Sequence, residues 1–74
     1  MKEHTYQDWC NSISQFIHYR MRAMEISLEH LAGISGLPLE MVMKFMDGRL
    51  YPPHKARKMM EAALGCSLEF VKPK

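Results

Sequence analysis

The sequence has few of the features that mark membrane proteins, disulfide-stapled proteins or disordered chains. Its 74 residues include two cysteines, four glycines and four prolines. Because no run of 18 apolar residues is present, no segment is expected to cross a membrane. Two distant cysteines in a chain without a signal peptide are expected to be free thiols, and this favours a cytoplasmic location.

The sequence also lacks the residue patterns of metal centres and catalytic sites. Zinc sites usually show closely spaced pairs of ligands, and the histidines and cysteines of this chain form no such pairs. No nucleophile with a base and an orienting group, no phosphate-binding glycine loop and no paired carboxylates can be recognised. The sequence therefore predicts no metal, no cofactor and no enzymatic activity. The six side chains considered as metal ligands are His4, Cys10, His18, His30, His54 and Cys66.

The residues that are present predict a single all-α domain covering positions 1–74. Apolar residues make up 47% of the chain, eight of them methionine, and this is enough to form a modest core. Helical periodicity and capping signals predict about five short helices and no strand. The expected helices are one that Thr5 caps and that ends near Met24, one from Ser27 to Ser35, one from Pro38 to Asp47, one from His54 to Leu64 and a short one from Ser67 to Val71, followed by a tail at 72–74.

Residues 27–47 have the spacing of a helix-turn-helix. Leu31 and Ala32 lie one turn into the first of two short helices, and Val42 and Phe45 recur three positions apart on the second. A small residue such as Ala32 lets two steeply crossing helices approach each other. Gly36 fits the corner because glycine adopts positive φ without a steric penalty.

These residues belong to a longer pattern that extends from about Ile13 to Val71. In this spacing the chain resembles the lambda-repressor-like (Xre/Cro) helix-turn-helix DNA-binding domains. The resemblance implies a compact helical bundle and binding to double-stranded DNA. The residues that carry the resemblance are, in order, Ile26-Ser27, Leu31-Ala32, Gly36-Leu37, Val42, Phe45, Gly48, Pro52 and the segment Ala63-Leu64-Gly65-Cys66-Ser67-Leu68-Glu69.

The resemblance implies that the third helix reads bases in the major groove, through side chains on its first two turns. Glu40 can accept a hydrogen bond from cytosine N4, and Lys44 can donate to guanine. Apolar side chains at this surface can pack on thymine methyl groups. The expected base-reading residues are Leu39, Glu40, Met43 and Lys44.

A basic segment follows the expected reading helix. Arg49, Lys55, Arg57 and Lys58 supply four positive charges within ten residues that contain no acid. One interpretation of such a charge run is that it simply forms the solvent-exposed face of a helix. In the resembled family this region lies along the phosphate backbone, and lysine, arginine and tyrosine suit phosphate contacts. The expected phosphate-binding residues are Ser27, through the backbone behind it, and Arg49, Tyr51, His54 and Lys55.

The function that these expectations imply is that of a transcriptional regulator, a repressor of phage, plasmid or bacterial origin acting in the bacterial cytoplasm or nucleoid. A lone domain of this size makes few DNA contacts, so we expect a homodimer on a palindromic operator. Leu68, Phe70 and Val71 in the terminal segment are the expected dimer interface. Packing of these residues on their own core is the alternative.

The chain also fits a protein-protein interaction module on a helix-turn-helix scaffold that has lost base reading. Readers in the resembled family are commonly polar, whereas Leu39 and Met43 are apolar here. Exposed methionine and leucine form adaptable surfaces for protein partners. The basic segment favours DNA, because a protein-binding module does not need it.

Overall fold

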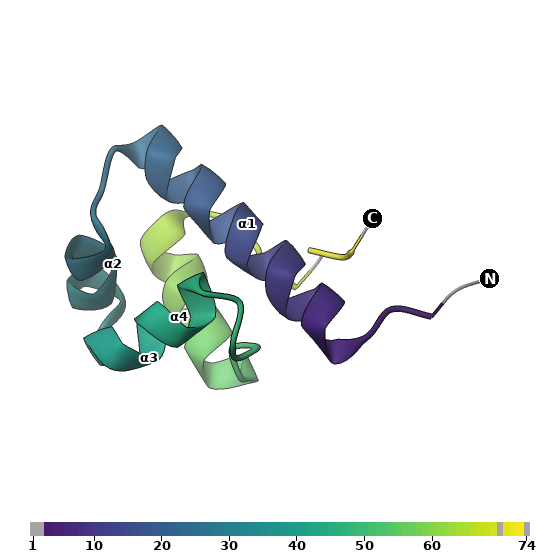
Figure 1. The fold of residues 1–74 in the computed structure, drawn as a ribbon. Helices are drawn as coiled ribbons and strands as arrows, with labels where there is room; N and C mark the ends of the chain where they lie inside the picture. The colour runs from purple at the N-terminus through teal and green to yellow at the C-terminus, as the bar shows by residue number, and fades with distance from the viewer. Residues whose placement is uncertain (1–2, 70, 74) are drawn as a thin grey trace.

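The longest element of the structure is a helix that begins near the amino terminus and lies over the remaining helices (Figure 1). The computed structural model describes residues 3–69 and 71–73. These residues form four α-helices and no strand. The helices are α1 (Tyr6–Met24), α2 (Leu28–Ser35), α3 (Leu39–Met46) and α4 (His54–Leu64).

The helix boundaries follow from local capping signals. Thr5 and Asp8 form a reciprocal capping box at the start of α1, and the Ser27 hydroxyl accepts a hydrogen bond from the His30 N–H at the start of α2. Gly36, with φ of 75°, ends α2 and turns the chain into α3. Gly65, with φ of 68°, ends α4 in the same way. All four signals were expected from the sequence.

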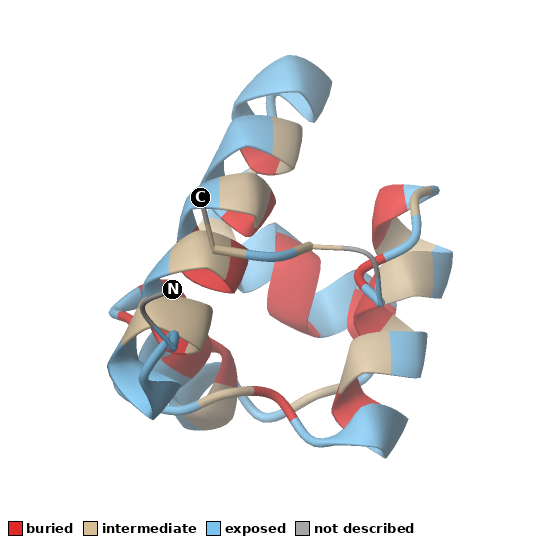
Figure 2. Ribbon diagram, turned by 90° about the vertical axis from the view of Figure 1, so that its right-hand side faces the viewer, coloured by how far each residue is buried: buried red, intermediate tan, exposed pale blue. Residues whose placement is uncertain are grey.

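One buried cluster joins the four helices. Red, buried segments of the ribbon face one another across the centre of the molecule in Figure 2. Phe45 and Val42 of α3 have no exposed surface, and Ala32 lies 7% exposed where α2 packs on its neighbours. The buried apolar residues of the cluster are Ile13, Ile17, Met21, Leu31, Ala32, Val42, Phe45, Met46, Ala56, Met60, Leu64 and Leu68.

Side chains of α1 also bind the carboxyl ends of two other helices. The buried Ser14 hydroxyl donates to the carbonyl oxygen of Met46, and His18 Nε2 lies 3.1 Å from the same oxygen. Arg20 Nη2 donates to the carbonyl oxygen of Leu64 over 2.9 Å. Since the last carbonyls of a helix have no partner within the helix, α1 satisfies groups that α3 and α4 leave open.

Two expectations about the helices differ from the structure. No described residue between Ser67 and Val71 is helical, so the expected fifth helix is not found there. Pro38 occupies the cap position just before α3 rather than its first turn.

Candidate nucleic-acid interface

The four expected base-reading residues lie together on the outer side of α3. Leu39 is 39% exposed and Met43 is 43% exposed, and Glu40 and Lys44 are exposed as well. Residues four positions apart are neighbours on a helix surface, so Leu39 lies beside Met43 and Glu40 beside Lys44. This outer face of α3 therefore combines an apolar row with a row carrying one acid and one base.

The inner side of α3 is held by α2 and by the turn between them. Leu31 is fully buried in the same cluster as Val42 and Phe45. At Gly36 an added Cβ would lie 3.5 Å from the Met59 Cε, so the corner packs closely on α4. Ser27, an expected phosphate contact, is exposed at the start of α2, where its hydroxyl already serves as the helix cap.

The segment after α3 carries exposed cations and one packed aromatic ring. Arg49 and Lys55 are exposed, and the Arg49 Nε lies 3.9 Å from Asp47 Oδ2. Tyr51 is half-buried, and its backbone N–H donates to the Tyr6 hydroxyl over 2.9 Å. Arg57 lies over the Tyr51 ring, 5.2 Å from its centroid, and donates to the Pro52 carbonyl. These two contacts hold the Arg57 side chain against the loop between α3 and α4.

Tyr51 also forms an aromatic corner that the sequence did not predict. Its ring meets Trp9 edge to face at a centroid distance of 6.5 Å. Tyr6, Trp9 and Tyr51 line a shallow hollow of about 320 Å³. No local pattern could have indicated it, because Tyr6 and Trp9 lie on α1 and Tyr51 lies more than 40 positions later in the chain.

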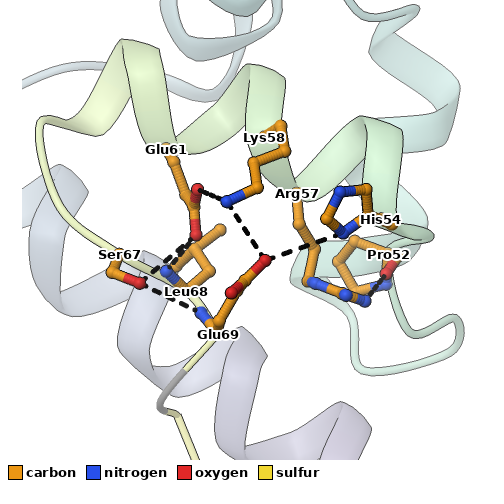
Figure 3. Close-up of polar contacts among 8 residues, drawn as sticks. All are labelled: Pro52, His54, Arg57, Lys58, Glu61, Ser67, Leu68 and Glu69. Atoms are coloured by element: carbon orange, nitrogen blue, oxygen red, sulfur yellow. Dashed lines mark hydrogen bonds and ion pairs between the residues drawn. The ribbon is translucent and has the colours of Figure 1, made fainter.

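Acidic side chains reach the basic segment in space, although the segment contains none in sequence (Figure 3). Lys58 Nζ lies 3.4 Å from Glu61 Oε1 and 3.1 Å from Glu69 Oε1. His54 Nδ1 lies 3.6 Å from the same Glu69 oxygen. Lys58 therefore has two carboxylates beside it, both from residues outside the basic segment.

These contacts shift two pKa values. Hydrogen bonds to Glu69 and then Glu61 raise the pKa of Lys58 above its ordinary value. The pKa of Glu61 is lowered, first because its carboxylate accepts the Leu68 N–H over 2.7 Å and then because Lys58 lies beside it. Both groups therefore hold their charges over a wider pH range than free side chains do.

The expected dimer residues behave differently from one another. Leu68 has no exposed surface and belongs to the core cluster, so it packs on its own chain, as the alternative interpretation of this residue expected, and offers no surface to a second copy. Its backbone N–H donates to the Glu61 carboxylate over 2.7 Å, which ties this part of the terminal segment to α4. Val71 is half-buried against the same cluster. Phe70 lies outside the described residues.

The described residues, 3–69 and 71–73, show no sign of a metal centre or of a membrane span. This part of the chain contains no group of three or more histidine, cysteine or acidic residues placed to hold a metal ion. Cys10, which is buried, and Cys66, which is half-buried, are free thiols. None of the four helices found there combines the length and the apolar character needed to span a membrane.

Comparison of the chain with models of known protein families, with curated proteins and with solved structures gave no significant match, so its function must be inferred from its own residues.

Proposed function

We propose that this chain is a sequence-specific DNA-binding transcriptional regulator in which α2, the Gly36 corner and α3 form a helix-turn-helix. One observation carries the proposal, namely the two-sided character of α3. Val42 and Phe45 fix its inner side in the core without exposed surface, while its outer face is exposed over two turns. A short helix held in this way is suited to insertion into the major groove.

The outer face of α3 offers a specific chemistry to base edges. Lys44 can donate to guanine O6 and N7, and Glu40 can accept from cytosine N4. Leu39 and Met43, adjacent on the other row, can pack on thymine methyl groups. These contacts would supply sequence preference, and Lys44 would supply the strongest of them because its donor is charged.

The segment that follows α3 supports contacts with the phosphate backbone. Arg49 and Lys55 are exposed cations. At the start of α4, Pro53 makes no side-chain cap and the first turn contains no acid. Free N–H groups and the positive end of a helix dipole favour a phosphate at such a position. Phosphate contacts of this kind fix orientation and register without reading sequence.

The proposed regulator acts as a homodimer on a palindromic operator and represses transcription by occluding a promoter. Two copies related by a two-fold axis would place their α3 helices in successive major grooves, roughly 34 Å apart. The second copy approximately doubles the number of contacts, which compensates for the small size of one domain. No further domain is required for repression of this kind.

The first experiment is repeated selection from random duplex DNA with purified full-length protein at two salt concentrations. The proposal predicts a palindromic motif and strongly salt-dependent affinity. Failure to enrich any sequence, with a protein shown to be folded by circular dichroism, would overturn it.

Substitutions then separate base contacts from phosphate contacts. Arg49→Ala and Lys55→Ala should weaken binding to all sequences and lower the salt slope by roughly one each. Lys44→Ala should change the selected motif. Arg22→Ala is the matched control, because it removes one exposed positive charge from α1, outside the proposed surface. Equal effects of Arg22→Ala and Arg49→Ala would count against the assignment.

A second candidate function is binding of a protein partner, and the exposed apolar side chains of α2 and α3 favour it. Ile34 is 49% exposed, in addition to Leu39 and Met43. Under this hypothesis Leu39→Ser or Met43→Ser should abolish capture of the partner from cell extract. Tyr19→Ser, at a 67% exposed position on α1, should leave capture unchanged. Capture unaffected by the α3 changes would exclude this surface.

A further inference from the structure

One carboxylate oxygen in the terminal segment lies beside two nitrogen groups of α4. Glu69 Oε1 is 3.1 Å from Lys58 Nζ and 3.6 Å from His54 Nδ1 (Figure 3). His54 and Lys58 are four positions apart, so they project from the same side of α4. Lys58 donates to this oxygen and the His54 ring lies within ion-pair distance of it, so the two side chains flank one anionic position, which a carboxylate of the same chain occupies in the free protein.

This contact is open to exchange with solvent ions or ligands. The side chains of His54, Lys58 and Glu69 are 67%, 51% and 38% exposed. Exposed ion pairs contribute little to folding and are weakened by salt. The contact is therefore not needed to hold the core together.

The neighbouring Glu61 is held much more firmly than Glu69. Its side chain is 13% exposed, and its carboxylate accepts the Leu68 N–H over 2.7 Å. Leu68 itself is fully buried and anchors the segment. The Glu69 side chain can therefore rotate away from α4 while Glu61 and Leu68 keep the terminal segment in place.

The start of α4 offers further positive potential to an incoming anion. His54 is the first residue of α4, which has no side-chain cap and no acid in its first turn. Lys55 is exposed beside it. A phosphodiester carries one negative charge shared by two oxygens, both of which accept strong hydrogen bonds from charged donors such as ammonium groups. The uncapped start of α4 adds to the positive potential that favours such an anion here.

We propose that His54 and Lys58 form a phosphate-binding site for the DNA backbone and that Glu69 occupies this site until DNA displaces it. The proposal rests on the proposed function and adds Lys58 to the phosphate-binding residues. Displacement frees Lys58 from Glu69, while its contact with Glu61 can remain. Glu69 thus lowers affinity for all DNA sequences alike, because a phosphate contact carries no sequence information.

The test compares two charge-matched variants of the full-length protein. Glu69→Gln removes the competing carboxylate, and Glu25→Gln removes an exposed acid at the carboxyl end of α1. Affinity for a labelled random-sequence duplex is measured by fluorescence anisotropy over a range of salt concentrations. Glu69→Gln should bind several-fold more tightly than Glu25→Gln, with a salt slope steeper by about one.

A third variant distinguishes the site from a general effect of charge. Adding Lys58→Gln to Glu69→Gln should remove the gain in affinity and return the salt slope to that of the wild type. Adding Arg22→Gln instead should leave most of the gain in place. A gain that survives Lys58→Gln would overturn the proposal.

The outcomes separate this inference from the function on which it rests. Duplex binding by the wild type, with Glu69→Gln and Glu25→Gln indistinguishable, would leave the DNA-binding function standing and show that Glu69 does not compete for the site. Absence of duplex binding by wild type and Glu69→Gln alike at low salt, with both folded, would overturn both.

Discussion

The two ends of the proposed DNA-binding surface are held in place by different forces. On the α2–α3 side, Val42 and Phe45 are fully buried, and apolar packing fixes the orientation of the helix. On the α4 side, Leu68 anchors the terminal segment in the same core, but the exposed part of the segment is arranged by hydrogen bonds and ion pairs centred on Glu61 and Lys58. Apolar packing responds little to salt or pH, whereas ion pairs respond to both. The chain thus combines a rigid surface with one that its ionic environment can rearrange.

The comparison predicts that the largest loss of stability follows from a change on the apolar side. Phe45→Ala would leave a cavity at the centre of the core and should cost about 3–5 kcal/mol. Met43→Ala, two positions away on the exposed face, should change stability by no more than about 0.5 kcal/mol. Urea denaturation followed by circular dichroism measures both. Similar effects at the two positions would show that α3 is not packed as described.

The next largest effect is expected where α3 ends against α1. Gly48 has φ of 72°, and an added Cβ would lie 2.9 Å from Asn11 Oδ1, which already accepts a hydrogen bond from Gln7. Gly48→Ala therefore adds to the backbone strain the cost of moving the Asn11 side chain away from its hydrogen bond with Gln7. Gly65→Ala, with φ of 68° and open space around it, should cost only the backbone strain of about 1–2 kcal/mol. The midpoint temperature of thermal unfolding should be lower for Gly48→Ala than for Gly65→Ala. The reverse order would contradict the close approach of Gly48 to Asn11.

The Ser27 cap of α2 is a polar contact on the α2–α3 side, and its loss should cost less than the loss of a core side chain there. Ser27→Ala removes the cap of α2 and should cost about 1 kcal/mol, less than the loss of a core side chain. Ser27→Asp retains an acceptor for the His30 N–H and should preserve stability. Denaturation midpoints of the two variants at neutral pH test this. Equal losses would indicate that the hydroxyl contributes through something other than the cap.

The effect of pH should be the smallest and should be confined to the α4 side. The pKa of Glu61 is lowered by the Leu68 N–H and by Lys58, so its contribution to stability is present above its ordinary pKa of 4.5. That contribution is lost as the pH falls through the lowered value in the folded protein. The Leu68 amide resonance should follow this titration, with a midpoint below pH 4.5. In Glu61→Gln the Leu68 resonance should no longer show this pH-dependent change. A midpoint at or above pH 4.5 in the wild type would contradict the lowered pKa of Glu61.

The sequence predicted features that are encoded within a few residues. Thr5, Ser27 and Gly65 act on their own helix ends, and so the bounds of α1, α2 and α4 could be predicted closely. The burial of Val42 and Phe45 followed from helical periodicity, whereas the outward-facing residues of α3 were expected from the resemblance.

Contacts between distant residues could not be predicted in this way. Helical periodicity cannot indicate that the Glu69 carboxylate lies beside His54. Nor can it indicate that the Tyr6 hydroxyl accepts a hydrogen bond from the Tyr51 N–H. The missing fifth helix has a similar cause. Ser67 accepts the Glu69 N–H, but Glu61 of α4 accepts the Leu68 N–H, and the Leu68 side chain is buried in the core. A tertiary contact thus overrode a local helix signal.

The hydrogen bonds from α1 have a consequence for protein engineering. Ser14 and Arg20 donate to backbone carbonyls at the ends of α3 and α4, and every residue type carries such a carbonyl. The outer positions of α3 can therefore be exchanged for other sequences without removing the bonds that hold its end. The fold is in this respect a natural scaffold for grafting, in which a library of α3 faces could be presented on an unchanged α1.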